Sequence, residues 1–99
     1  MRLNSGIRLL ASEFRGKQVF AAGMNLIGAV DDLMIDVQSY TLTDLTMKLR
    51  KEAARKILGK TFMLGSARAR VPVSAVDKVG DSIILRFSID QLQEHIQKL

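Results

Sequence analysis

The 99-residue sequence has no cysteine and a single histidine, His95. The lack of cysteine excludes disulfides, thiolate catalysis and sulfur-rich zinc sites. A serine nucleophile would have only His95 as a histidine base, and no Gly-x-Ser-x-Gly elbow is present. Glycine motifs that bind phosphates or dinucleotides are missing too. The triplet Gly59-Lys60-Thr61 imitates the end of a phosphate loop but lacks the upstream glycine of that motif. We therefore expect a protein that is not an enzyme and that needs no cofactor.

Acidic residues offer no clear metal site in place of cysteine and histidine. Asp31, Asp32 and Asp36 are close in sequence but lack EF-hand spacing, since no glycine and terminal glutamate follow in register. We therefore expect no metal site, and we expect these carboxylates to face water or to cap the rim of the fold. His95 is expected on the surface.

Long apolar runs are also absent. No segment approaches the roughly 20 apolar residues that a membrane-spanning helix needs. The first ten residues contain too few apolar side chains for the core of a secretory signal. A cysteine-free chain also fits a reducing compartment. The expected location is the cytoplasm, without insertion into a membrane.

The chain does contain enough apolar residues to fold. Hydrophobic residues make up 47% of the sequence, and the length suits one domain rather than two. We therefore expect a single domain over residues 1–99. A core of this size gives a small margin of stability, which self-association would increase.

Charge is unevenly distributed around a net value of +5. The stretch 48–70 is strongly basic and contains one acid, Glu52, whereas the stretch before it carries Asp31, Asp32, Asp36 and Asp44 without a basic residue among them. The basic residues are a solvated face, a partner for the acidic stretch, or a binding surface for an acidic ligand. The candidate basic patch comprises Lys51, Arg55, Lys56, Lys60, Arg68 and Arg70.

Nucleic acid is one ligand that such a patch would suit. Clustered lysine and arginine are sufficient for phosphate contacts. Binding of single strands usually adds aromatic side chains for stacking, and the basic stretch holds only Phe62. The sequence therefore allows phosphate binding but gives little support for readout of bases.

Short segments rich in β-forming residues, with tight turns between them, predict a mainly β fold that is either a small barrel or a strongly bent sheet. Strands are expected at 17–21, 26–37, 40–47, 68–73 and 82–87, of which the first three are antiparallel neighbours. Gly28, inside the second strand, predicts a bulge or a bend. Residues 12–15 and 74–77 are expected to form single helical turns.

Two longer helices are expected to cover an open side or an edge of the β-structure. Residues 48–58 combine strong helix formers with an apolar face, and Gly59 follows at the C′ position. Residues 88–99 begin with a capping box of Ser88 and Gln91. The apolar stripe of this second helix comprises Ile89, Leu92, Ile96 and Leu99. The stripe binds another protein, packs on the domain itself, or does both across a dimer.

Two runs of residues resemble the PRC-barrel domain family. The run Gly16-Lys17-Gln18-Val19-Phe20, followed by Gly23 and by Ile27-Gly28-Ala29-Val30-Asp31-Asp32, is similar to the opening strands of that family. The later segment with Val71-Pro72, Val79-Gly80-Asp81 and Ile83-Ile84-Leu85 is similar to the closing segment, above all in the stand-alone archaeal members. The basic helix at 48–58 and the C-terminal helix are additions to this pattern.

This resemblance implies a small β-barrel, with its core at about residues 9–87, that mediates protein–protein contacts. Some stand-alone archaeal members, called CdpB, are cell-division adaptors that associate with related barrel proteins and with SepF, which anchors the FtsZ ring. The resemblance thus implies a homodimer or a heterodimer with a sister barrel, and a SepF-like partner at the division site. The alternative is a module associated with RNA or ribosome maturation that uses the basic segment 48–70.

Overall fold

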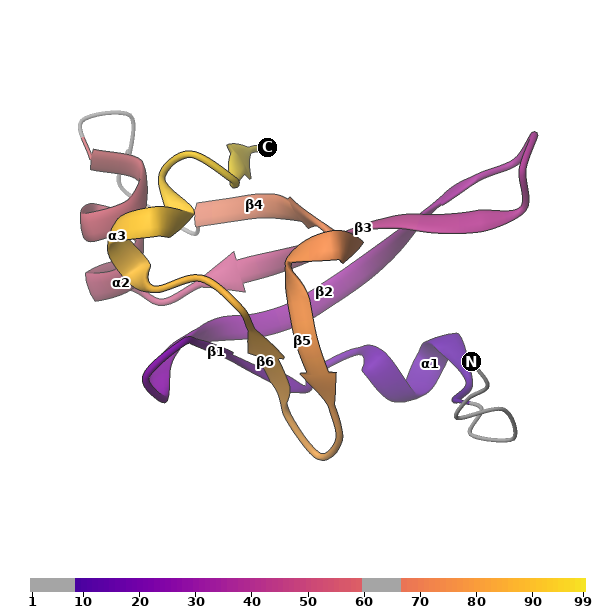
Figure 1. Cartoon of the computed structure of the whole chain (residues 1–99), viewed down its shortest axis with the longest axis horizontal. Helices are drawn as coiled ribbons and strands as arrows, with labels where there is room; N and C mark the ends of the chain where they lie inside the picture. Colours follow the sequence, from indigo (N-terminus) through magenta and orange to yellow (C-terminus); the bar gives the residue numbers. More distant parts are fainter. Residues whose placement is uncertain (1–8, 60–66) are drawn as a thin grey trace.

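The computed structural model describes residues 9–59 and 67–99. Seven strands form one mixed sheet in the order β5-β6-β1-β2-β3-β4-β7, and three short helices flank it (Figure 1). This architecture confirms the mainly β fold that the sequence predicts. The molecule measures 41 × 30 × 22 Å along its principal axes.

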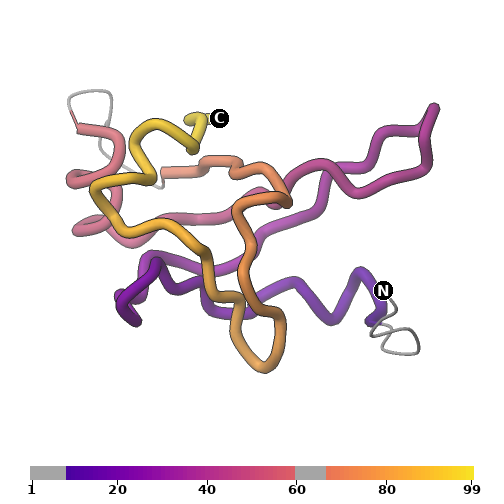
Figure 2. The backbone as a smooth tube through the Cα atoms, viewed as in Figure 1, coloured from indigo at the N-terminus to yellow at the C-terminus, as the bar shows by residue number. Residues whose placement is uncertain are grey.

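The first half of the chain forms an antiparallel meander, as the sequence predicts. Its elements are α1 (Ala11–Phe14), β1 (Gln18–Ala21), β2 (Asn25–Asp36) and β3 (Thr41–Leu49). β1 pairs with the start of β2, and β3 pairs with β2 along nearly its whole length. The β2–β3 hairpin therefore continues well beyond the end of β1 and projects from the body of the molecule (Figure 2).

The second half of the chain adds strands to both sides of this meander. Its elements are α2 (Lys51–Leu58), β4 (Ala67–Pro72), the 3₁₀ turn η2 (Val73–Ala75), β5 (Val76–Val79), β6 (Ile83–Leu85), α3 (Ile89–Leu92) and β7 (Gln97–Lys98). β4 joins β3 in antiparallel register, and β6 lies parallel to β1 on the other side. β5 was not predicted, because 76–79 was assigned partly to a helical turn and partly to a loop.

Helix α2 confirms the predicted basic helix and its end, but it begins at Lys51, because Lys48 and Leu49 belong to β3. Ala53, Ala54 and Ile57 are buried against the sheet side of the molecule, while the basic residues stay exposed. Gly59 ends the helix at a φ of 59°, and its backbone N–H donates to the carbonyl of Arg55. Glycine suits this position because the left-handed region is costly for residues with a side chain.

Gly28 occupies the most crowded backbone position of the sheet. A Cβ atom placed there would overlap the carbonyl oxygen of Lys48 on the neighbouring β3 and would lie 3.1 Å from the Cα of Leu49. The register between β1 and β2 also shifts beside it, between Val19 and Phe20. The bulge predicted from Gly28 is therefore confirmed, and the close approach of two backbones explains the glycine.

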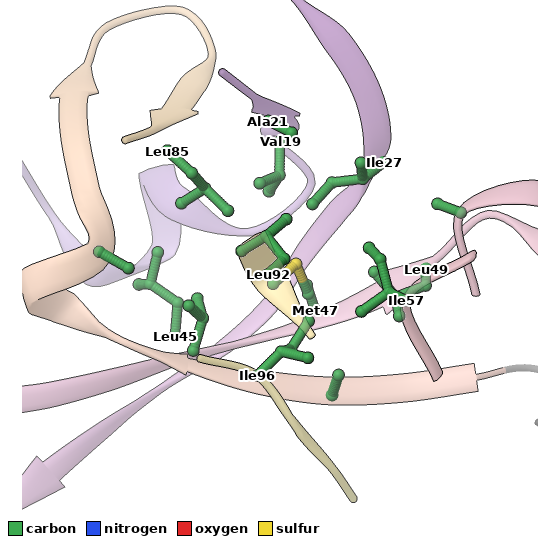
Figure 3. Packing of buried hydrophobic residues seen from close by; sticks show 14 of the residues in the cluster. Val19, Ala21, Ile27, Leu45, Met47, Leu49, Ile57, Leu85, Leu92 and Ile96 are labelled. Atoms are coloured by element: carbon green, nitrogen blue, oxygen red, sulfur yellow. The ribbon is translucent and has the colours of Figure 1, made fainter. Parts of the chain in front are cut away.

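The core lies between the curved sheet and the helices. Side chains from β1, β2, β3 and β6 converge with those of α2 and α3, and Leu92 lies in the middle of them (Figure 3). The largest fully buried side chains are Ile27, Met47, Ile83, Leu85, Leu92, Val19 and Val71. A single cluster thus joins both halves of the sequence.

The C-terminal segment corrects the prediction of a helix over 88–99. The capping box is present: Ser88 Oγ accepts from the N–H of Gln91, and Gln91 Oε1 accepts from the N–H of Ser88 at 3.0 Å. The helix nevertheless ends at Leu92, and the chain turns and pairs with β4 as the edge strand β7. Pairing satisfies backbone groups that the edge of β4 would otherwise expose, whereas a twelve-residue helix is marginal by itself.

Of the two forms that the sequence allows, a small barrel or a strongly bent sheet, closure into a barrel is not detected among the described strands. Within 9–59 and 67–99, no strand pairing joins β5 to β7, so these two strands are the edges of the sheet. Closure would need backbone hydrogen bonds between those edges. The sheet instead curves around its core and leaves the β2–β3 hairpin to extend outward (Figure 1).

Candidate functional site

The outer part of the β2–β3 hairpin is the most exposed element of the fold. β1 pairs with β2 only as far as Ala29, and β4 pairs with β3 only as far as Asp44. The hairpin beyond these points is a two-stranded ribbon without a third strand on either side in the described chain. We call residues 33–44 the arm, and its first and last residues still join it to the body, since Leu33 packs against the core and Asp44 pairs with Pro72 of β4.

Large apolar side chains on the arm face solvent. The exposed fractions are 58% for Ile35, 77% for Val37 and 86% for Tyr40, whereas Ile27 on the inner half of β2 is fully buried. Isolated exposed apolar residues are common on proteins, but here three of them lie close in sequence on one projecting ribbon. These three side chains therefore contribute little to the core and are open to a partner.

Polar contacts close the tip of the arm. Asp36 Oδ1 accepts a hydrogen bond from the N–H of Gln38 at 2.9 Å, and the hydroxyls of Ser39 and Thr41 are 2.6 Å apart. Tyr40 completes the turn at a φ of 58°, in the left-handed region. Glycine or asparagine usually takes such a position, because a tyrosine side chain raises its energy there.

Two ion pairs hold the base of the arm to the body. Arg68 of β4 pairs with Asp31, and Arg15 after α1 pairs with Asp32 at 3.2 Å. A hydrogen bond from the N–H of Leu33 and a second one from Arg15 hold the pKa of Asp32 below its ordinary value of 3.8. Asp36 and Asp44 take part in no ion pair with a described residue, so the arm itself is acidic.

The predicted basic patch is divided between two elements. Lys51, Arg55 and Lys56 are exposed on α2. Arg68 and Arg70 alternate with buried residues of β4 and leave the sheet on the face away from the core. Arg68 is paired with Asp31, and both Nε and Nη2 of Arg70 donate to the side-chain oxygen of Gln97. Lys60 lies outside the described residues. The arginines of β4 thus stabilise the fold, and the α2 cations are the ones open to a ligand.

A cleft of about 220 Å³ lies between α2 and the turn that joins β1 to β2. We call it the turn cleft. Met24, Leu26 and Ile89 contribute to its lining, but most of the lining surface is polar, and Arg50 and Lys56 bring two cations against one carboxylate, that of Glu52. Met24 is 65% exposed and has a φ of 65°. The turn cleft is therefore a mainly polar site with positive charge, beside an exposed turn.

The apolar stripe predicted as a protein-binding face belongs largely to the core. Leu92 is fully buried, Ile96 is buried with it, and Ile89 packs partly against the same cluster (Figure 3). Leu99 is 53% exposed, in the segment after β7. Of the alternatives that the sequence leaves open for the stripe, packing on the domain itself therefore holds for Leu92 and Ile96.

No helix within 9–59 or 67–99 has the length and apolar character to cross a membrane. In the same part of the chain, no three histidine, cysteine or acidic side chains gather as a metal ion would require. His95 is exposed and stacks on Phe87, with their ring centroids 3.9 Å apart.

The model of one protein family matches residues 7–92, which is most of the chain, and that family is the PRC-barrel domain. The chain belongs to the PRC-barrel domain family. No curated protein matches the sequence. The matched residues run from before α1 to the end of α3.

The arm is the functional candidate that sequence reasoning missed. The alternation around Ile35 and Val37 correctly predicted a strand, but it carried no information about which neighbours the strand would have. One signal was present: strands of 12 and 9 residues are long for a small domain. Tyr40, which the sequence predicts as the first residue of the strand 40–47, instead lies in the turn before β3.

Proposed function

We propose that this PRC-barrel protein is a non-catalytic adaptor that binds other proteins through the arm. The observation that carries the proposal is the exposure of Ile35, Val37 and Tyr40 on a ribbon with no third strand in the described chain. Interfaces gain most of their free energy from a few buried apolar and aromatic side chains. A rigid ribbon presents such residues at a small cost in conformational entropy.

The specific form of the proposal is an adaptor of archaeal cell division. The family resemblance supports a cytoplasmic protein at the division site, with a SepF-like protein, a sister PRC-barrel protein, or both as partners at the FtsZ ring. The arm would then provide the contact, because the side chains of Ile35, Val37 and Tyr40 are exposed and take no part in the core. The acidic residues Asp36 and Asp44 would favour a partner surface with basic charge.

The test measures binding of the purified protein to the SepF homologue of the same organism by isothermal titration calorimetry. The double variant Val37→Ser/Tyr40→Asn should weaken binding at least tenfold. Val79→Ser is the matched control, because Val79 is also exposed, at 45%, but lies on β5 in the body. Absence of binding by the unchanged protein would reject the division partner, and equal binding by all three proteins would reject the arm as the contact.

A module that binds RNA is a second candidate. The side chains of Lys51 and Arg55 are exposed and make no hydrogen bond or ion pair with described residues. Binding to phosphates weakens linearly with salt on a logarithmic scale. Fluorescence anisotropy with labelled RNA would therefore show a steep salt dependence that Lys51→Glu/Arg55→Glu removes. A flat response would reject this candidate.

A further inference from the structure

Two exposed turns hold an apolar residue where the backbone suits glycine or asparagine. Met24 and Tyr40 are the two non-glycine residues with positive φ in the described chain. Their side chains are among the most exposed apolar groups of the protein, so the fold does not benefit from them. Costly backbone conformations persist where another requirement maintains them, and they concentrate at functional sites. Both turns are therefore candidates for contacts outside the chain.

These two turns lie at opposite ends of the molecule. Tyr40 is in the tip of the arm, and Met24 is in the β1–β2 turn, at the end of the molecule where α2 lies (Figure 1). The longest dimension of the molecule is 41 Å. The arm of a chain therefore does not reach the turn cleft of the same chain, but a second copy in the opposite orientation brings the two together.

The arm and the turn cleft are opposite in charge. The arm offers the carboxylate of Asp36, which forms no ion pair with a described residue, beside the exposed side chains of Val37 and Tyr40. The turn cleft offers the cations of Arg50 and Lys56 against the single carboxylate of Glu52, with the exposed side chain of Met24 beside them. Most of the surface that lines the turn cleft is polar, so the match depends on charge.

We propose that two copies of this chain form a pair in which the arm of each copy binds the turn cleft of the other. A two-fold axis repeats the same contact twice and leaves neither arm unused. Contact between two arms is disfavoured, because it would bring the carboxylates of Asp36 and Asp44 from both copies together. This inference rests on the proposed role of the arm as a protein-binding surface, and it names a second copy as the partner.

A charge-swap experiment tests the contact. One variant carries Asp36→Lys/Asp44→Lys on the arm, and the other carries Arg50→Glu/Lys56→Glu at the turn cleft. Analytical ultracentrifugation should give the unchanged protein a mass twice that of the 11.0 kDa chain, and each variant alone the mass of one chain. An equimolar mixture should restore the double mass, because each lysine-bearing arm then meets a glutamate-bearing cleft and each original arm meets an original cleft.

Tyr40→Asn provides a second arm variant without any change of charge. Asparagine suits the positive φ, so the turn is retained while the aromatic ring is lost. Self-association should weaken at least tenfold, and circular dichroism should show an unchanged fold for this variant and for both charge variants. Raising the salt concentration should also weaken the pair, since the Debye length falls from about 10 Å at 0.1 M to about 3 Å at 1 M.

Three results would overturn the inference. They are a single-chain mass of the unchanged protein up to millimolar concentration, a double mass that persists in both charge variants, and a mixture that stays at the single-chain mass. The proposed function is tested separately, by titration with the SepF homologue. A single-chain protein whose arm still binds that partner would reject the pair and keep the adaptor, whereas an arm-dependent pair without such binding would do the opposite.

Discussion

The two ends of the β2–β3 hairpin have similar apolar residues in opposite surroundings. In the inner half, Ile27 and Met47 are buried between the sheet and the helices, with β1 and β4 alongside. In the outer half, Ile35 and Val37 face solvent on a ribbon with no third strand in the described chain. An alternating strand pattern is thus compatible with burial of its apolar residues in the core and with their exposure to solvent. Whether an apolar residue becomes core or contact surface depends here on the neighbouring strand, and that is a property of the whole fold.

This comparison predicts that substitutions in the body change stability, whereas those in the arm change association. Leu92→Ala should have the largest effect, because Leu92 is fully buried in the middle of the core. We expect the free energy of unfolding to fall by about 4 kcal/mol, from lost burial and the remaining cavity. Urea unfolding followed by circular dichroism measures it.

The matched control is Leu99→Ala, in the same C-terminal segment but largely exposed. We expect a change within about 0.5 kcal/mol. Similar losses at both positions would show that Leu99 is as tightly packed as Leu92, and would contradict the separation of the C-terminal segment into buried and exposed parts.

Gly28→Ala is expected to have the second largest effect. The added methyl group would overlap the Lys48 carbonyl on β3, so two central strands would have to move apart. Overpacking of this kind costs about 3 kcal/mol. Thermal unfolding should show the loss, and Gly80→Ala should not, because nothing lies within 4 Å of a Cβ at Gly80. An unchanged melting temperature for Gly28→Ala would contradict the close approach of β2 and β3.

The sequence predicted those parts of the body that depend on local signals. The bounds of β1, β2 and β3 follow from alternation and turn residues, and α2 follows from its apolar face and Gly59. β7 was missed because the spacing of Leu92 and Ile96 fits a helix as well as it fits a turn followed by a strand. The edge of β4 decides between them, and no local pattern reports that edge.

Substitutions of Thr46 and Thr43 would probe the place where body and arm meet. Thr46 is buried on β3, and its hydroxyl finds no partner among the described residues. Thr46→Val keeps the shape and removes this unpaired group, so the free energy of unfolding should rise by about 1 kcal/mol. Thr43→Val is the matched control with the opposite sign, because the Thr43 hydroxyl donates to the Met34 carbonyl at 3.3 Å. A loss of stability in both variants would indicate that Thr46 does have a hydrogen-bond partner.

In the arm, Val37→Ser should leave the free energy of unfolding within about 0.5 kcal/mol of the original, because the side chain is exposed. Tyr40→Asn should leave it unchanged or raise it by up to about 1 kcal/mol, since asparagine tolerates the positive φ better. Chemical denaturation at a concentration low enough to exclude self-association measures both changes. A clear loss of stability in either variant would show that the arm belongs to the folding unit as much as the body does.

The smallest expected effect concerns the base of the arm and its dependence on pH. The N–H of Leu33 and the guanidinium of Arg15 hold the folded pKa of Asp32 below 3.8. In acid, the unfolded state therefore becomes more stable relative to the folded state, because Asp32 binds a proton more readily in the unfolded chain. The stabilising contribution is therefore complete above the unfolded pKa and disappears as the pH falls through the lower folded pKa.

Nuclear magnetic resonance titration of the Asp32 carboxyl should show this lowered pKa. Arg15→Gln should raise the pKa only in part, because the stronger bond from Leu33 remains. Arg86→Gln, which breaks the distant pair with Asp77, should leave the pKa of Asp32 unchanged. Full return to the ordinary value in Arg15→Gln would mean that the ion pair alone, rather than the local backbone of β2, fixes this carboxylate where the arm leaves the body.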